Sequence, residues 1–110
     1  MNIFSYINIV GCKMKMPSEM QFEKLSKSIK ALSDAGRLKI VINLLEKEMC
    51  VGEISESLKI SQSATSHSLR ILKDANVLKC RKQGNVIYYS ICDSHIETLV
   101  KMLIEHVNCQ

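Results

Sequence analysis

Hydrophobic residues recur at helical spacing along the first half of the chain and predict two helices. The first begins after Pro17, where Ser18 and Gln21 form the capping-box pair of a helix start. Its apolar positions are Phe22, Leu25, Ile29 and Leu32. Beyond a break at residues 33–36, the second helix has its apolar positions at Leu38, Ile40, Val41, Leu44 and Leu45. We expect both apolar faces to enter the core.

Two short helical segments follow, separated by only two residues. They cover residues 51–58 and 61–75, and Ser61 is well placed as the N-cap of the second segment. Two helices joined by so short a turn predict a helix-turn-helix. In the second helix, the residues expected on the buried side are Ala64, Leu69 and Leu72.

The pattern then changes to two runs rich in β-branched and aromatic residues. Residues 77–82 and 86–91 predict a pair of strands. The residues between them, Gln83-Gly84-Asn85, supply the glycine and asparagine of a tight hairpin turn. A hairpin with basic residues near its tip is typical of the wing of a winged helix.

A last helix is predicted near the C-terminal end of the sequence. It begins at Asp93-Ser94, where Ser94 and Glu97 match a second capping box. Its apolar residues continue at helical spacing as far as Val107. Helices followed by a helix-turn-helix, a β-hairpin and a closing helix describe a mainly α fold with a β-hairpin wing, the winged helix-turn-helix.

Length and composition fit one small globular domain. The chain has 110 residues, of which 46% are hydrophobic and 24% are charged. We expect residues 18–110 to form the domain and residues 1–17 to form an N-terminal arm or extra helix. The apolar start is too short to span a membrane and lacks the preceding basic residue of a signal peptide. Five cysteines without a C-x-x-C pair fit a reducing cytoplasm.

Basic residues are concentrated in the predicted helix-turn-helix and wing. Residues 59–85 contain six Lys or Arg residues and one acid, whereas the whole chain has a formal charge of +4. Such a local excess suits the phosphates of DNA. The sequence contains no paired carboxylates, Gly-rich phosphate loop or nucleophile with its base, so we do not expect an enzyme.

The second helix of the helix-turn-helix carries most of the expected DNA contacts. The first residues of such a helix lie against base edges in the major groove and should be short or polar. The side chains that meet this requirement are Gln62, Ser63, Thr65, Ser66 and His67. Further along the helix, Arg70 and Lys73 are placed to reach phosphates. The residues expected to carry the wing's contacts are Arg81, Lys82, Gln83 and Asn85.

Three segments resemble the hallmark sequences of the ArsR/SmtB family of bacterial repressors. They are residues 31–40 (ALSDAGRLKI), 61–70 (SQSATSHSLR) and 83–91 (QGNVIYYSI). The resemblance extends over roughly residues 19–109. It implies a homodimeric winged-helix repressor that binds double-stranded operator DNA and leaves it when an inducer, commonly a metal ion, binds.

The last helix carries four competent metal ligands, which are Asp93, His95, His106 and Cys109. Eleven residues separate the two histidines, about 16 Å along a helix axis, whereas ligands of one zinc ion lie within about 4 Å of each other. The same spacing leaves both histidines within about 20° on one face. Two such helices packed antiparallel in a homodimer would bring Asp93 and His95 of one subunit against His106 and Cys109 of the other. Twofold symmetry would then produce two sites.

The residues between these ligands define the expected subunit contact. Leu99 and Met102 are expected in the seam between the subunits, and the residues expected to face the subunit's own core are Ile96, Val100, Leu103 and Val107. The ligand spacing resembles the C-terminal-helix zinc site of the zinc-sensing branch of the family, where His or Glu is usual at the position of Cys109. The donor set favours Zn²⁺ and also accepts Co²⁺ or Cd²⁺.

Two other functions stay open, because each of the four residues also has an ordinary role at a helix end. One is a repressor of the same fold that senses thiols or persulfides through two of the cysteines. The other is a DNA-binding dimer without a ligand. A second metal site known in the family would have only Cys12 and Cys50 here, and two ligands are too few.

Overall fold

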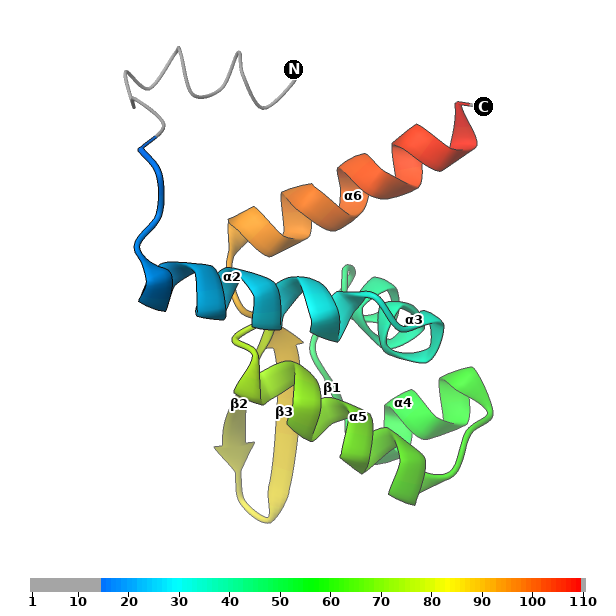
Figure 1. Ribbon diagram of the computed structural model, residues 1–110. Helices are drawn as coiled ribbons and strands as arrows, with labels where there is room; N and C mark the ends of the chain where they lie inside the picture. Colours follow the sequence, from blue (N-terminus) through cyan, green and yellow to red (C-terminus); the bar gives the residue numbers. More distant parts are fainter. Residues whose placement is uncertain (1–14, 110) are drawn as a thin grey trace.

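The structure, a computed structural model, describes residues 15–109 of the chain. Its elements, in order, are α2 (Glu19–Leu32), α3 (Ala35–Asn43), β1 (Met49–Cys50), α4 (Val51–Leu58), α5 (Gln62–Asp74), β2 (Leu78–Gln83), β3 (Val86–Ile91) and α6 (Ser94–Asn108). Figure 1 shows α2 and α6 above the helix-turn-helix and the hairpin. Most of the arm expected at residues 1–17 lies outside the described residues.

The start of α2 confirms the predicted capping box. The Ser18 hydroxyl accepts a hydrogen bond from the Gln21 backbone N–H at 3.2 Å, and the Gln21 side chain accepts one from the Ser18 N–H at 2.9 Å. These two bonds satisfy backbone donors that the first turn of a helix leaves without partners. The boundary predicted from the sequence is therefore correct.

The start of α6 differs from the prediction. Its N-cap is Asp93, whose Oδ1 accepts hydrogen bonds from the backbone N–H groups of His95 and Ile96 at 3.0 and 3.1 Å. The predicted capping box of Ser94 and Glu97 is wrong, because Ser94 is already the first helical residue. An aspartate is as good an N-cap as a serine, and here it lies one residue earlier.

The core lies between the helix-turn-helix, α3 and the base of the sheet. Its largest fully buried side chains are Ile40, Ile54, Leu69, Leu72, Leu78, Val41, Val77, Val100 and Thr65. Leu38 and Leu45 of the predicted second helix pack against this cluster. The apolar face predicted for that helix is therefore confirmed.

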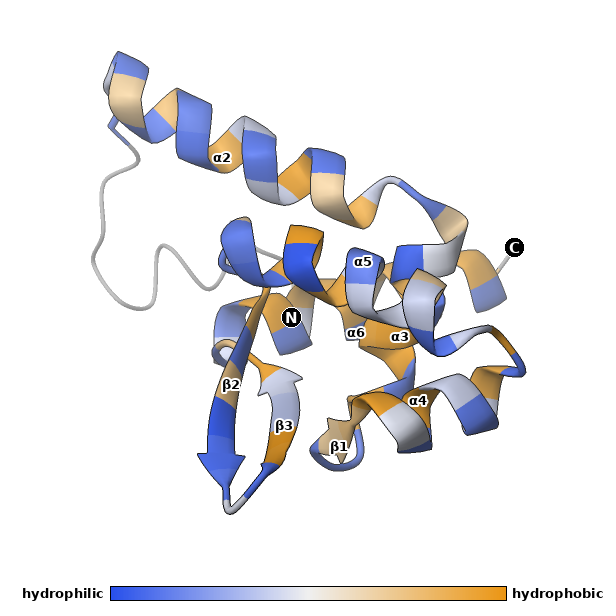
Figure 2. Ribbon diagram, turned by 90° about the horizontal axis from the view of Figure 1, so that it is seen from below, coloured by the Kyte–Doolittle hydropathy of each residue, from blue (hydrophilic) through white to orange (hydrophobic). Residues whose placement is uncertain are grey.

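The sheet has one strand more than the sequence predicts. β1 has two residues and pairs antiparallel with β3, so the strand order is β1-β3-β2. A two-residue strand is too short for an alternating pattern to reveal it. The hairpin is as expected, with Gly84 at a φ of 63° in the turn between β2 and β3. Figure 2 shows that β2 is hydrophilic along most of its length.

Two helices leave apolar side chains outside this core. On α2, Phe22, Leu25 and Ile29 are 37%, 48% and 56% exposed, so their predicted place in the core is wrong. On α6, Leu103 and Val107 are also exposed, and Ile104 packs against the core instead. No helix among residues 15–109 is both long and apolar enough to cross a membrane.

Candidate DNA interface and ligand-binding helix

The helix-turn-helix consists of α4, a short turn and α5. α4 ends at Leu58, and its C-cap Lys59 takes the left-handed conformation at a φ of 57°. The turn closes with a hydrogen bond from the Ile60 N–H to the Ser55 carbonyl. Ser61 then caps α5 by accepting a hydrogen bond from the Ala64 N–H at 3.0 Å. These local contacts fix where the second helix begins.

Most side chains expected to read DNA lie on the exposed side of α5. Gln62, Ser63, Ser66 and His67 are exposed in its first half, and Arg70 and Lys73 are exposed further along. The first half therefore presents short polar side chains to solvent, as a helix in the major groove requires. Contact with DNA itself stays a prediction for all six residues.

Thr65 is an exception, and its predicted role in base reading is wrong. Its side chain is 0% exposed, and its Oγ1 donates a hydrogen bond to the Ser61 carbonyl at 2.8 Å. Thr65 lies four and seven residues before Leu69 and Leu72, so these three residues share the buried face of α5. Ala64, expected on that face, is exposed. The same spacing in the sequence already carries the signal for this assignment.

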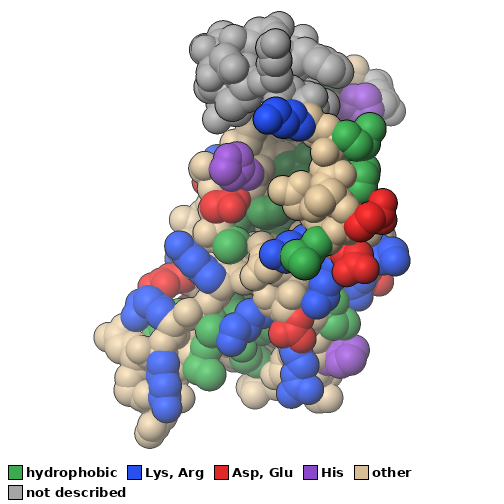
Figure 3. Space-filling model, turned by 60° about the vertical axis from the view of Figure 1, so that its left-hand side comes forward, with side chains coloured by type: hydrophobic (Ala, Val, Ile, Leu, Met, Phe, Trp, Pro, Cys, Tyr) green, Lys and Arg blue, Asp and Glu red, His purple; other side chains and the backbone are tan. Residues whose placement is uncertain are grey.

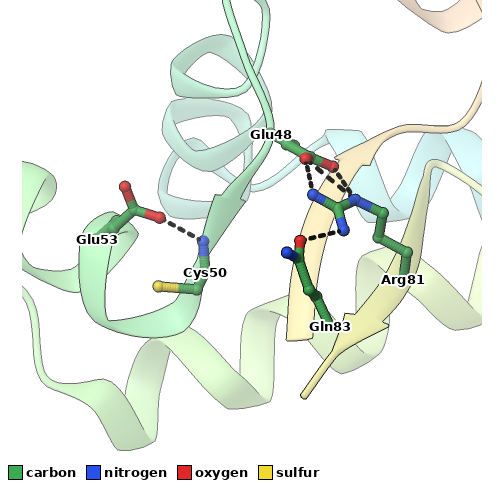
Figure 4. A network of polar contacts seen from close by, with 5 residues as sticks. All are labelled: Glu48, Cys50, Glu53, Arg81 and Gln83. Atoms are coloured by element: carbon green, nitrogen blue, oxygen red, sulfur yellow. Dashed lines mark hydrogen bonds and ion pairs between the residues drawn. The ribbon is translucent and has the colours of Figure 1, made fainter. Parts of the chain in front are cut away.

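Arg81 of β2 has its guanidinium group engaged within the protein. Its Nε donates to both carboxylate oxygens of Glu48, at 3.0 and 2.9 Å, and Nη2 contacts the same carboxylate. Nη1 donates to Gln83 Oε1 at 2.8 Å, and the group lies 4.8 Å from the centroid of the Tyr88 ring. Figure 4 shows Arg81 between Glu48 and Gln83. Arg81 and Gln83 therefore contact each other, whereas the sequence predicts that both contact DNA.

Electrostatics follow from this geometry. The hydrogen bonds from Arg81 lower the pKa of the Glu48 carboxyl, and the same bonds raise the pKa of Arg81. Both groups therefore stay charged at neutral pH. Glu48 lies 33 positions before Arg81, so no local sequence pattern points to the pair.

Other polar groups of the wing remain at the surface. Lys79 and Lys82 on β2 are exposed, and so is Asn85 in the turn. Figure 3 shows Lys and Arg side chains spread over the lower half of the molecule, which contains the wing and the helix-turn-helix. This half therefore carries the basic surface that the charge pattern predicts.

The four expected metal ligands are exposed at the two ends of α6. Asp93 and His95 lie at its start, with 3.6 Å between Asp93 Oδ1 and His95 Nδ1, and His106 and Cys109 lie at its end. Hydrogen bonds from the helix backbone, that of Ile96 first, lower the pKa of the Asp93 carboxyl, so it is ionised at neutral pH. Within residues 15–109, no three potential ligands come together in one chain.

Comparison with known proteins decides the family. Residues 34–79 match the family described as bacterial regulatory protein, arsR family. The cadmium resistance transcriptional regulatory protein CadC homolog of Staphylococcus aureus is 41% identical over 83 residues, which are 74% of this chain and 69% of that protein. The chain belongs to the ArsR family. Members of this family are transcriptional regulators that bind DNA, so the expectation that the chain is not an enzyme is confirmed.

Further comparisons agree with this placement of the ArsR-family regulator. The transcriptional repressor SmtB homolog of Synechocystis is 34% identical over 87 residues, which are 79% of this chain and 66% of that protein. The regulator thus spans about two thirds of the length of these two relatives. The homodimeric winged helix-turn-helix DNA-binding domain from Mycobacterium bovis has a TM-score of 0.78 at 22% identity, over 86% of this chain and 91% of that one. This likeness confirms the winged helix-turn-helix fold.

The cysteines of the regulator bear on the thiol-sensing alternative. Cys50 pairs with Tyr88 and Cys80 with Tyr89, so the two thiols lie on opposite faces of the sheet. Since β3 lies between their strands, they are also about 10 Å apart, beyond the roughly 7 Å within which two Cα atoms can be bridged. Cys50 is also the N-cap of α4, and Cys12 lies outside the described residues. The sheet therefore offers no disulfide between these two cysteines.

Proposed function

We propose that this regulator represses transcription by binding operator DNA as a homodimer and is released when zinc or a similar divalent metal binds its last helices. The observation that carries the proposal is the placement of two pairs of potential metal ligands, all four exposed, at opposite ends of α6. The names of two relatives support it, because one is a repressor of the SmtB type and the other a cadmium resistance regulator.

Exposed polar residues support DNA binding. α5 presents short polar side chains in its first half, and basic residues follow on α5 and on the wing. A side chain that pairs with a base edge specifies sequence, whereas a lysine or arginine on a phosphate adds affinity that salt weakens. A twofold dimer should therefore prefer an inverted repeat whose half-sites are about one helical turn apart.

Uncovered apolar faces support the homodimer. Leu25 and Ile29 on α2 and Leu99 and Met102 on α6 are between 39% and 56% exposed. Large apolar side chains gathered on two helices are typical of surfaces that a partner covers. The similar domain from Mycobacterium bovis is homodimeric. We place the partner copy on these two helices.

The donor set of α6 fits a tetrahedral metal ion. A carboxylate, two imidazoles and a thiol are all ligands of zinc, and cobalt(II) and cadmium accept the same donors. Asp93 uses Oδ1 as the helix cap, and its second carboxylate oxygen makes no hydrogen bond among the described residues. The metal would draw Asp93 and His95 of one subunit towards the partner's His106 and the partner's Cys109. When bound, the metal would link the two α6 helices of the dimer through its coordination bonds.

Metal and DNA would then act on each other through the dimer. The ligands lie on α6 and the reading residues on α5, so metal can weaken DNA binding only by favouring a dimer in which the two reading helices no longer match successive grooves. The coupling must be reciprocal, and couplings of roughly 1 to 3 kcal/mol are typical. We place this repressor in the cytoplasm, whose reducing conditions fit the four cysteines within residues 15–109, which form no disulfide.

The decisive experiment measures operator affinity with and without saturating zinc. Wild type should lose affinity on zinc addition, His106→Ala should not, and the neighbouring Asn108→Ala should respond like wild type. Unchanged wild-type affinity would leave a DNA-binding dimer with no metal switch. An equal loss of operator affinity on zinc addition in His106→Ala would mean that His106 is not part of the sensing site. If an oxidant lowers operator affinity and zinc does not, the thiol-sensing alternative is favoured.

A further inference from the structure

Arg81 lies where the wing leaves the body of the protein. β1 pairs with β3 only at Tyr88 and Tyr89, so beyond Tyr88 the hairpin continues as two strands alone. Arg81 is the residue of β2 directly opposite Tyr88. It is therefore at the last level of the sheet that still has three strands.

The contacts of Arg81 join β2 to β3 and to the residue before β1. Its guanidinium lies over the ring of Tyr88 on β3 and reaches Glu48, which immediately precedes β1. The hydrogen bond to Gln83 continues along the same face of β2 towards the turn. Since β1 leads directly into α4, the ion pair ties the base of the wing to the first helix of the helix-turn-helix.

We propose that Arg81 and Glu48 position the wing relative to the helix-turn-helix, and that Arg81 is not a phosphate contact. The inference deepens the proposed DNA binding and rests on it. Three of the five N–H groups that an arginine carries donate to Glu48 and Gln83. The negative charge of Glu48 also offsets the positive charge of Arg81 that would attract a phosphate. DNA contact on the wing falls instead to exposed groups such as Lys82 and Asn85.

The two roles predict opposite effects for the loss of Glu48. If Arg81 bound a phosphate, the nearby carboxylate would repel the DNA, and Glu48→Gln would tighten binding. If the pair positions the wing, Glu48→Gln should weaken operator binding by about as much as Arg81→Ala. The two losses should also not add in full in the double variant, because both break the same ion pair.

The first arm of the test measures operator affinity against salt. Arg81→Ala and Glu48→Gln should each lose affinity, on the order of tenfold, with an unchanged salt slope. Arg81→Lys should not restore affinity, because an ammonium cannot bridge a carboxylate and an amide as a guanidinium does. Lys82→Ala is the matched control, and its slope should fall by about two, one phosphate for each subunit. Tighter binding by Glu48→Gln, or rescue by Arg81→Lys, overturns the proposal.

The second arm needs no DNA and so separates this proposal from the proposed function. Hydrogen exchange of the wing amides should speed up in Arg81→Ala and in Glu48→Gln but not in Lys82→Ala, with similar unfolding midpoints for all three. Faster exchange confined to residues 78–91 in both variants supports the positioning role even if no operator binds. Unchanged wing exchange in both variants overturns it.

Discussion

Ser28 Oγ, in the middle of α2, donates a hydrogen bond of 3.0 Å to the carbonyl oxygen of Ala75. Ala75 is the C-cap of α5, and carbonyls at a helix end lack helical partners. The bond therefore connects a helix that we place in the dimer contact with the end of the helix that we expect to read DNA. A change in how two α2 helices pack would therefore shift the position of α5 through this bond.

We expect Ser28→Ala to lower the free energy of unfolding by about 1 kcal/mol, the usual net contribution of one such hydrogen bond. Ser26→Ala, at an exposed position of the same helix, is the control for the better helix propensity of alanine. The difference between the two variants, measured by denaturant unfolding, isolates the bond. Equal stability of both variants would mean that the bond contributes nothing.

Thr65 gives a prediction that separates folding from recognition. Thr65→Val keeps the shape of the buried side chain and leaves the Ser61 carbonyl paired with the Thr65 backbone N–H at 3.0 Å. We expect a loss of about 1 kcal/mol of stability and no change in the ratio of operator to random-DNA affinity. Ser66→Ala, on the exposed face, should lower that ratio if Ser66 pairs with a base, by a factor that corresponds to roughly 1 to 3 kcal/mol of binding free energy. A lower ratio of operator to random-DNA affinity in Thr65→Val would mean that Thr65 does take part in base reading.

The difference between these two neighbours shows where sequence reasoning succeeds and fails. Caps, turns and helical or alternating periods are local, so the helix-turn-helix and the hairpin could be predicted within a residue or two. The exposed face of α2 could not, because the same apolar period serves a core or a partner. The pair of Glu48 and Arg81 depends on a strand of two residues and a separation of 33 positions, and neither leaves a local pattern.

Asp93 combines two roles that two substitutions can separate. Asp93→Ala should destabilise the protein by about 1 kcal/mol, because two backbone N–H groups at the start of α6 lose their acceptor. Asp93→Asn should keep nearly all the stability, since asparagine is an equally good N-cap. It should still weaken zinc binding, because a neutral amide replaces the ionised carboxylate. Competition with a chromogenic chelator measures this, and wild-type zinc affinity in Asp93→Asn would remove Asp93 from the ligand set.

The pKa of Glu48 predicts how the wing responds to acid. The pKa of the Glu48 carboxyl in the folded protein lies below that of an ordinary glutamate, because Arg81 hydrogen-bonds the charged carboxylate. A lowered folded pKa means that the pair stabilises the wing fully above the unfolded value and is lost as pH falls through the folded value. The Arg81 Nε–H resonance should therefore change with a midpoint below the ordinary pKa of a glutamate in wild type and show no such step in Glu48→Gln. A midpoint at or above the ordinary glutamate value would contradict the pair.

Mixed dimers test whether the metal site spans two subunits. With His95→Ala in one subunit and His106→Ala in the other, one of the two sites keeps both histidines and the other loses both, because the ligands pair across the twofold axis. Each mutant homodimer keeps one histidine in both sites and should bind zinc weakly. The mixed dimer, purified by two different tags, should therefore recover one high-affinity zinc per dimer, and titration calorimetry or cobalt absorption can count it. If confirmed mixed dimers recover no high-affinity zinc site, the two histidines do not belong to one site that spans the subunit contact.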